Sequence, residues 1–205
     1  HAMAAEADEF IIHESLAHIV ALAHPAPVSA LILGGGDGAS ARELLKHPSL
    51  TRIVVAELDP DVVRVVSAEI PALPAGAFDN PRVALHIGDA AETLRTLHAR
   101  GERFDLIVAN PPYVAEGDPH LELNGLPHEP RLALTDQEAG GNGLACIRRI
   151  VADAAAHLNP GGWLLFEHGY DQGEASRNLL AAAGFKAAFT QPDLAGTDRV
   201  SGGQL

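Results

Sequence analysis

Short apolar runs alternate with amphipathic stretches along most of the chain, and this alternation predicts an α/β fold. The apolar runs, predicted as strands, are 28–33, 52–57, 83–87, 104–109, 163–168 and 185–191, with a short last strand at 199–201. The stretches with helical character are 7–22, 41–46, 59–70, 90–98, 136–157 and 173–183, and within 136–157 the helix proper is expected after the glycines at 140–143. Strands and helices that alternate in this way form a mostly parallel sheet covered by helices on both faces. We therefore expect a single domain over 1–205 with a mostly parallel, seven-stranded sheet.

Two segments fall outside this pattern. Residues 111–131 are polar and show few periodic signals, so we expect a long loop there. A loop of that length inside a compact domain is usually functional or mobile. The first residues, His1-Ala2-Met3, have the form of a tag remnant ahead of a start, and the fold prediction leaves them out.

The composition narrows the class of protein. The 205 residues carry a net charge of −13, which disfavours nucleic acid as a partner. A cationic cofactor or a basic protein surface suits this charge, and a contribution to solubility alone is the other interpretation. No apolar run approaches the length of a membrane span. The chain has one cysteine, Cys146, so no intrachain disulfide can form and we expect a reducing compartment, the cytoplasm. Eleven histidines are present, but their spacings give no convincing ligand set, so we predict no metal site.

A glycine-rich turn follows the first predicted strand. Gly34, Gly35, Gly36 and Gly38 surround Asp37, and a helical pattern comes next. A strand, a glycine turn and a helix in this order open the nucleotide site of Rossmann-type sheets. Glycine allows positive φ and lets a ligand approach the backbone closely. The spacing differs from G-x-G-x-x-G, so a pyrophosphate is not strongly implied, and a tight strand–helix connection is the alternative interpretation.

Acidic residues follow the next two predicted strands. Glu57 ends the second strand, and Asp59 already provides a cap for the helix after it, so Glu57 is free to accept the hydroxyl protons of a ribose. Asp89 follows the third strand and either accepts from an adenine amine or caps the next helix. No basic residue lies in the glycine turn or in the three positions after it. An adenosine ligand without phosphates fits best: S-adenosylmethionine or a relative such as S-adenosylhomocysteine.

The fourth predicted strand runs directly into Asn110-Pro111-Pro112-Tyr113. An amide nitrogen is a poor nucleophile because its lone pair is delocalised. Hydrogen bonds from its N–H groups to the Asn110 side-chain oxygen and the Pro111 carbonyl would orient it toward a methyl donor. The prolines fix φ and hold that carbonyl in place. Tyr113 offers a ring face to a sulfonium or to the substrate, while a simple strand-ending loop is the alternative.

The first half of the chain resembles spermidine synthases. The segments that carry this resemblance are 8–14, 33–38, 44–48 and 78–83, within a matching region from about 8 to about 95. The resemblance implies a site for decarboxylated S-adenosylmethionine, with Asp37 near its amino group and Glu57 on its ribose. In that family an acid follows the fourth strand, where this chain has Asn110.

The second half, from about 104 to 205, resembles the glutamine methyltransferases of peptide-chain release factors. The segments that carry this resemblance are 110–113, 128–134, 161–173 and 193–200. It implies a Rossmann-like class I methyltransferase fold that uses S-adenosylmethionine, and a release factor with a Gly-Gly-Gln loop as the protein partner. It also implies the strand order three-two-one-four-five-seven-six with an antiparallel last strand. Methyltransferases of this type usually have an acid where this chain has Ile32, and Asp37 is expected to replace it.

Because the two resemblances meet near the fourth strand, we interpret the chain as a chimera joined near 95–105. The leading function is methylation of a glutamine amide, with Asn110, Pro111 and Tyr113 as catalytic residues. Asn110 would also contact the cofactor, together with the glycine turn, Glu57 and Asp89. An aminopropyltransferase and a scaffold with little or no activity are the alternatives.

Overall fold

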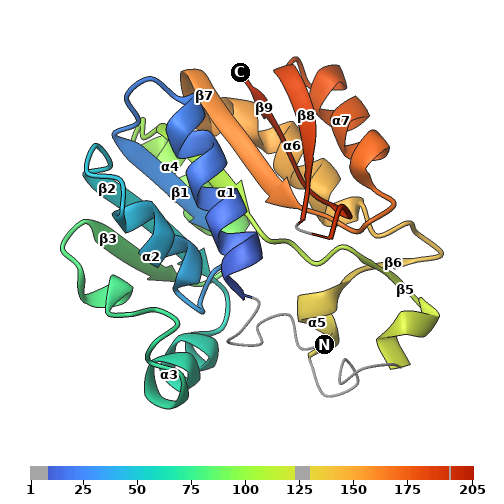
Figure 1. Cartoon of the computed structure of the whole chain (residues 1–205), viewed down its shortest axis with the longest axis horizontal. Helices are drawn as coiled ribbons and strands as arrows, with labels where there is room; N and C mark the ends of the chain where they lie inside the picture. The colour runs from blue at the N-terminus through green and yellow to red at the C-terminus, as the bar shows by residue number, and fades with distance from the viewer. Residues whose placement is uncertain (1–8, 123–129, 194) are drawn as a thin grey trace.

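The computed structural model describes residues 9–122, 130–193 and 195–205 and shows a twisted central sheet with helices on both sides (Figure 1). Its strands lie in the order β3-β2-β1-β4-β7-β9-β8. The strands of this sheet are β1 (Ser29–Leu33), β2 (Arg52–Glu57), β3 (Val83–Ile87), β4 (Phe104–Ala109), β7 (Leu158–Glu167), β8 (Lys186–Pro192) and β9 (Asp198–Gln204). The helices are α1 (Glu9–Ala23), α2 (Ala39–Leu45), α3 (Pro60–Glu69), α4 (Ala90–Ala99), α5 (Arg131–Leu134), α6 (Ala145–His157) and α7 (Gly173–Ala182), with 3-10 turns η1 (Ala77–Asp79) and η2 (Pro119–Glu122).

The predicted fold class and strand order are confirmed. Pairing is parallel from β3 through β2, β1 and β4 to β7, and β9 is antiparallel to both β7 and β8. Counted along the main sheet, this is the order three-two-one-four-five-seven-six. The predicted helix 7–22 begins, like the tag remnant, outside the described residues.

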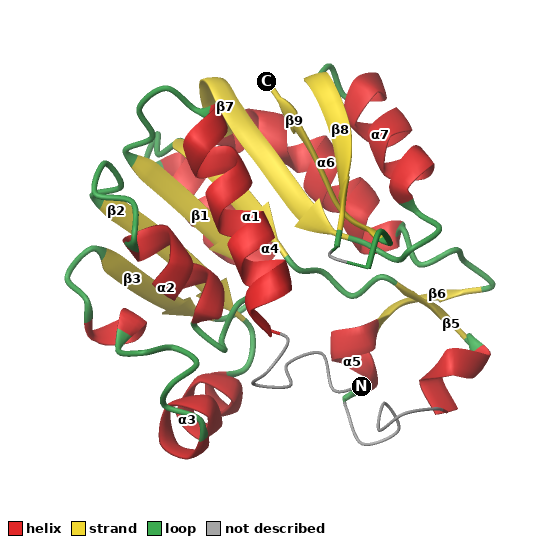
Figure 2. Ribbon diagram, viewed as in Figure 1, coloured by secondary structure: helices red, strands yellow, loops and turns green. Residues whose placement is uncertain are grey.

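The core lies in two layers, one on each face of the sheet. Neighbouring residues of β1 illustrate the division, because Leu31 packs with residues of α4, α6 and α7 whereas Ile32 packs with residues of α1 and α2. Successive side chains of a strand point to opposite faces, so both faces of a central strand must be apolar. Figure 2 shows α1 and α2 in front of the strands and α4 and α6 behind them.

Two predictions around the rim of the sheet are only partly right. The helix expected after the glycines at 140–143 is confirmed as α6, which begins at Ala145, but the residues before those glycines form the strand β6 (Thr135–Ala139). Gly140 and Gly143, both with positive φ, separate the two elements. The expected loop 111–131 contains β5 (Val114–Glu116), which pairs with β6 in a separate two-stranded sheet, and η2. In Figure 2, β5, β6 and α5 lie at the side toward which the parallel strands point.

Two strands in the C-terminal half, β7 and β9, are longer than predicted. Strand β7 starts at Leu158 instead of 163. Its pairing with β4 shifts register between Leu158, which pairs with Phe104, and Trp163, which pairs with Leu106. Strand β9 extends through Gly202 and Gly203 to Gln204. A Cβ on Gly202 would lie 2.2 Å from Leu165 Cδ1, so glycine allows close packing here although it is a poor strand former.

Asp105 joins the start of β1 to β4 and β7. Its Oδ2 accepts hydrogen bonds from the backbone N–H groups of Val28 (2.8 Å) and Ser29 (3.0 Å), and its Oδ1 accepts one from Asn159 Nδ2 (2.7 Å). Burial alone would raise the pKa of this carboxyl, but the hydrogen bonds outweigh burial and lower the pKa. The ionised form is therefore the one that stabilises the fold.

We expect Asp105→Ala to lower the free energy of unfolding by about 2 kcal/mol at pH 7. Because the folded-state pKa is lowered, the stabilisation is present above the ordinary carboxyl pKa and is lost as the pH falls through the folded-state pKa. Urea denaturation at pH 7 and at successively lower pH measures the difference, with Asp171→Ala, an exposed acid, as the control. A variant as stable as wild type at pH 7 would contradict this assignment.

Among the described residues, no helix combines the length with the apolar character that crossing a bilayer requires.

Candidate functional site

The glycine turn (34–38) reverses the chain between β1 and α2. Gly34, Gly35 and Gly38 have φ values of 80°, 91° and 76°. The Gly38 N–H donates to the Gly35 carbonyl at 2.9 Å, which closes the turn. A Cβ on Gly38 would lie 2.6 Å from that of Pro74, so both conformation and space require glycine at this position.

Glu57 connects the end of β2 to the glycine turn. Its Oε2 accepts a hydrogen bond from the Gly36 N–H at 2.8 Å, and its Oε1 accepts one from the Asp59 N–H at 2.9 Å. A Cβ on Gly36 would lie 2.7 Å from Glu57 Cγ, so the carboxylate rests directly against the turn. Asp59 caps α3 by accepting from the Asp61 N–H, as predicted, and this leaves Glu57 directed toward the turn.

A cavity of about 210 Å³, here called the glycine-turn cavity, lies beside this turn. Asp37 and Glu57 supply its acidic lining, and Ile32 and His13 also face it. Asp37 Oδ1 accepts from the Ala39 N–H at 2.9 Å, and its Oδ2 lies 3.6 Å from His13 Nε2. Asp37, which is expected to replace the acid usually found at the position of Ile32, therefore lines the same cavity as Ile32.

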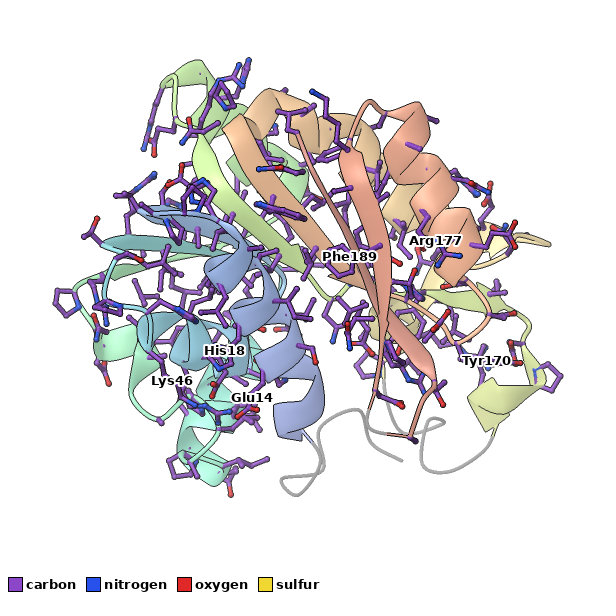
Figure 3. The ribbon with its side chains drawn as sticks, turned by 45° about the horizontal axis from the view of Figure 1, so that its top comes forward. Glu14, His18, Lys46, Tyr170, Arg177 and Phe189 are labelled. Atoms are coloured by element: carbon purple, nitrogen blue, oxygen red, sulfur yellow. The ribbon has the colours of Figure 1, made fainter. Side chains whose placement is uncertain are left out.

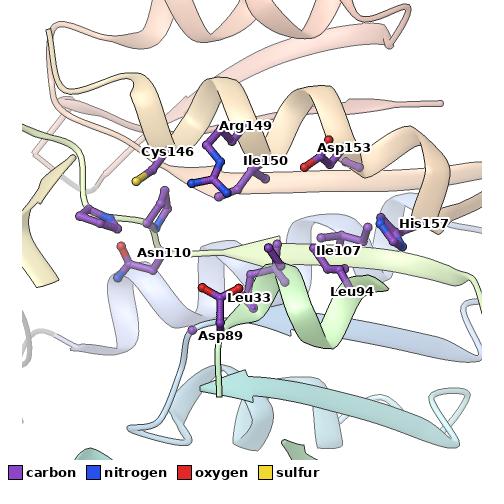
Figure 4. A pocket seen from close by; sticks show the side chains of 16 residues that line it. Leu33, Asp89, Leu94, Ile107, Asn110, Cys146, Arg149, Ile150, Asp153 and His157 are labelled. Carbon is purple, nitrogen blue, oxygen red and sulfur yellow. The ribbon is translucent and has the colours of Figure 1, made fainter. Parts of the chain in front are cut away.

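A second cavity of about 250 Å³, the helix cavity, lies between α4 and α6 (Figure 4). Gly34 and Asp89 line its end near the rim, and Cys146, Arg149 and His157 line it from α6. Apolar side chains complete the lining; in Figure 4 these include Leu33, Leu94, Ile107 and Ile150. The cavity thus combines an apolar wall with a few charged side chains, Asp89, Arg149 and Asp153, the usual character of a small-molecule site.

Asp89 caps α4, one of its two predicted roles, and it also faces the helix cavity. Its Oδ1 accepts from the Glu92 N–H at 3.0 Å and caps α4, while its side chain also lines the helix cavity.

Two titratable side chains of α6 also line the helix cavity. Burial is the main cause that lowers the pKa of His157 at the far end of this cavity. The Nδ1 atom of His157 is buried without a hydrogen-bond partner among the described residues. Burial likewise raises the pKa of the Cys146 thiol, so this cysteine is not an activated nucleophile.

Asn110 lies at the junction of the two cavities. It follows β4 directly and lines both cavities, a position that it shares with Leu33. Its Oδ1 atom is buried and has no hydrogen-bond partner among the described residues. Pro111, which follows, is buried and lines the helix cavity. Buried acceptors are nearly always paired in folded proteins, so this oxygen is a candidate for contact with a ligand.

Tyr113 lies apart from both cavity linings. Its hydroxyl donates to Oε1 of Glu167 at 2.8 Å, and its ring packs against the core cluster that contains Phe166. Burial raises the pKa of the Glu167 carboxyl to about 7, although the Tyr113 hydrogen bond and the charge of Arg199 act to lower it. The sequence prediction missed Glu167 as a partner of Tyr113, and the available signal was an acid at the end of an otherwise apolar strand.

Glu167 and His168 take different partners, as the alternation of strand side chains predicts. His168 Nε2 lies 2.8 Å from Ser201 Oγ, and its Nδ1 lies 2.7 Å from the Gly169 carbonyl. Burial is the main cause that lowers the pKa of His168, so the imidazole is neutral near pH 7. The two residues therefore do not form an acid–base pair.

One group of potential metal ligands occurs among the described residues, where α1 meets α2. Glu14, His18 and Glu43 place ligand atoms close to one another, and Figure 3 shows Glu14, His18 and Lys46 gathered there. Burial would raise the pKa of Glu43, but hydrogen bonds from Lys46 Nζ (2.5 Å) and Arg42 Nε (2.8 Å) lower it. These cations already neutralise the buried carboxylate, so its placement is explained without a metal ion.

A family model described as the spermine/spermidine synthase domain matches residues 9–117. The match continues past the expected limit near 95 and includes the Asn-Pro-Pro-Tyr segment. Polyamine aminopropyltransferase 1 of Hyperthermus butylicus is 45% identical over 103 residues, which are 50% of this chain and 35% of that protein. A crystal structure of spermidine synthase in complex with the transition state analogue AdoDATO superposes with a TM-score of 0.73 at 25% identity, covering 98% of this chain and 63% of that one.

The release factor glutamine methyltransferase of Xylella fastidiosa (strain Temecula1) is 41% identical over 172 residues, or 84% of this chain. This chain spans 58% of the length of that relative. A match of that length crosses the suspected join near 95–105, so the likeness to these methyltransferases is not confined to the second half. The chimeric origin itself stays a prediction. With resemblances to both groups, and with a domain match that covers more than half of its length, the chain belongs to the spermine/spermidine synthase domain family.

Proposed function

We propose that this chain is an S-adenosylmethionine-dependent methyltransferase that acts on the side-chain amide of a glutamine in a protein. The observation that carries the proposal is the unpaired, buried Oδ1 of Asn110 at the junction of the two cavities. An unpaired buried acceptor costs about 1–3 kcal/mol, and a donor from a bound ligand would remove that cost. An amide nitrogen carries such a donor.

The lining of the two cavities fits the proposed cofactor. In the glycine-turn cavity, Asp37 would pair with the ammonium group, and Glu57 would accept from the ribose hydroxyls. In the helix cavity, Asp89 and the apolar wall would receive the adenine. Gly36 lies so close to Glu57 that a side chain at position 36 would occupy the space in front of the carboxylate, where the ribose would bind. Once bound, the cofactor would supply an electrophilic methyl group attached to a positively charged sulfur.

The Asn-Pro-Pro-Tyr segment would orient the acceptor amide. Asn110 Oδ1 and the Pro111 carbonyl would accept its two N–H groups and direct the nitrogen toward the methyl carbon. This arrangement compensates for the weak nucleophilicity of an amide. The names of the curated relatives point to a peptide-chain release factor as the protein substrate, and the glutamine of a Gly-Gly-Gln loop is the acceptor that we propose.

Transfer of an aminopropyl group is the second candidate function, because the matching family model is that of spermine/spermidine synthases. The donor would then be decarboxylated S-adenosylmethionine. An amine acceptor is protonated near pH 7 and must lose that proton before its nitrogen can attack, and a carboxamide is too weak a base to accept it. An amide nitrogen is already neutral, and the proton that it loses on methylation is acidic enough to pass to water, while the donor leaves as S-adenosylhomocysteine. Asn110 therefore favours amide methylation over this alternative.

The chain, 1–205, would act as one domain. The free Cys146 is compatible with a reducing compartment such as the cytoplasm.

Calorimetry with three ligands tests the proposal. S-adenosylmethionine and S-adenosylhomocysteine are expected to bind, and both more tightly than decarboxylated S-adenosylmethionine. A preference for the decarboxylated compound would favour aminopropyl transfer, and absence of heat with all three would leave a scaffold without this activity. Methyl transfer is then measured with labelled cofactor and a release factor, using the Gln→Ala variant of its Gly-Gly-Gln loop as the control. Equal labelling of both proteins would exclude that glutamine as the acceptor.

A further inference from the structure

The short segment from the end of β7 to the start of α7 contacts Tyr113 at two points. Glu167, which is 1% exposed, accepts a hydrogen bond from the Tyr113 hydroxyl at 2.8 Å. Gln172, which is 8% exposed, donates from Nε2 to the Tyr113 carbonyl at 2.9 Å. Both the ring and the backbone of Tyr113 are thus held by residues far away in the sequence.

Gln172 joins three loops through one side chain. Its Nε2 donates to the carbonyls of Tyr113 and Asn142, both at 2.9 Å, and its Oε1 accepts from the Gly169 N–H at 2.8 Å. A Cβ on Gly143 would lie 2.1 Å from the Tyr113 carbonyl oxygen, so the loop before α6 also packs directly against the backbone of Tyr113. Both amide protons and the oxygen of Gln172 are used, which makes it a rigid connection.

We infer that Glu167 and Gln172 are positioning residues that hold Tyr113, and through it the Asn-Pro-Pro-Tyr segment, in the geometry needed by the acceptor. The inference rests on the proposed function. Neither residue lines either cavity, so their effect on the reaction passes through Tyr113 rather than through the cofactor. A group that only positions the acceptor should influence kcat more than the binding of the cofactor.

The hydrogen bond between Tyr113 and Glu167 changes in strength with pH. Burial raises the pKa of Glu167 to about 7, and the opposing influences are the Tyr113 hydroxyl and the charge of Arg199 on β9. Arg199 is itself 3.3 Å from the carboxylate of Asp193, and the adjacent His168 is kept neutral by burial. An ionised carboxylate accepts a stronger hydrogen bond than a protonated one. The hydrogen bond from the Tyr113 hydroxyl to Glu167 therefore becomes stronger as the pH rises through about 7.

Tyrosine NMR tests this physical claim without any assay of activity. The chain has two tyrosines, and the other one, Tyr170, is 61% exposed, so Tyr170→Phe assigns the signal of Tyr113. With ring-labelled tyrosine, we expect the Tyr113 Cζ shift to titrate with a midpoint near pH 7 in Tyr170→Phe and to stay flat near pH 7 once Glu167→Gln is added. A flat Tyr113 signal in Tyr170→Phe, or an unchanged titration after Glu167→Gln, would overturn the inference.

Kinetics tests the consequence for the reaction. We expect kcat to rise between pH 6 and 8 in wild type and to be flat over that range in Glu167→Gln. Gln172→Leu should lower kcat about tenfold with little change in the dissociation constant of S-adenosylhomocysteine. Variants that lose thermal stability but keep the wild-type kcat and pH profile would show a structural role only.

The same set of experiments separates the two proposals. If no cofactor binds and no methyl group is transferred, the proposed function fails, while the NMR titration still reports whether Glu167 holds Tyr113. If Glu167→Gln does not fold, Tyr113→Phe removes the same hydrogen bond and should likewise abolish the rise of kcat near pH 7. A Tyr113→Phe enzyme with the wild-type pH profile would contradict the inference.

Discussion

Replacing Asn110 by alanine should lower kcat for methyl transfer by about 100- to 1000-fold, the loss typical of removing one preorganised polar group from an active site. The variant loses the buried, unpaired acceptor at the junction of the two cavities, while both cavities keep the rest of their lining. The loss in kcat should therefore exceed the loss in affinity for S-adenosylhomocysteine. Single-turnover transfer of a labelled methyl group, together with calorimetry, measures the two quantities.

Two further variants make this experiment specific. Asn178→Ala changes an exposed asparagine on α7 and should leave kcat unchanged. Asn110→Asp keeps the size of the side chain but introduces a carboxylate, a base that suits an amine, which must be deprotonated before it attacks, rather than an already neutral amide. Methylation by Asn110→Asp or Asn110→Ala at the wild-type rate would refute the role assigned to this side chain.

Replacing Glu57 by alanine should weaken the binding of S-adenosylhomocysteine by about 100-fold or more. Two ribose hydroxyls would each lose a hydrogen bond to a charged acceptor, and such bonds contribute about 1.5–3 kcal/mol each. The variant also removes the acceptor of the Gly36 N–H and so loosens the glycine turn. Isothermal calorimetry at fixed pH and salt gives the change directly.

The control for Glu57 is a nearby acid outside the cavity. Asp61 lies in the first turn of α3, where its side chain is 71% exposed and pairs with Arg64 at 3.1 Å. Asp61→Asn should leave the affinity unchanged, because exposed ion pairs contribute little. If Glu57→Ala bound the ligand as tightly as Asp61→Asn, the ribose would have to lie elsewhere.

The fold was predictable because its central strands have a simple physical signature. Residues 31–33 and 106–109 are buried on both faces of the sheet, so they must be continuously apolar and stand out in the sequence. Strand β6, Thr135–Ala139, lacks that signature because most of its residues are exposed and polar. Its pairing with β5 depends on contacts across the rim that no local pattern records.

The candidate site was only partly predictable, for a similar reason. Glycines and acids at strand ends are local signals, and Glu57, Asp89 and Asn110 follow from them. The contact of Tyr113 with Glu167 joins residues 54 positions apart, and its importance comes from burial, which the sequence does not show. The division of the site into two cavities that share Asn110 depends likewise on how α1, α4 and α6 pack on the sheet.

The position of β9 has a consequence for how the protein is made. Strand β8 precedes β9 in the chain but lies outside it in the sheet, so its backbone pairs with β9 alone. Until residues 198–204 have been synthesised, β8 has no neighbour and the edge of β7 stays open. Ribosomal synthesis proceeds more slowly than hydrogen bonds form, so nascent chains spend time with an uncapped edge.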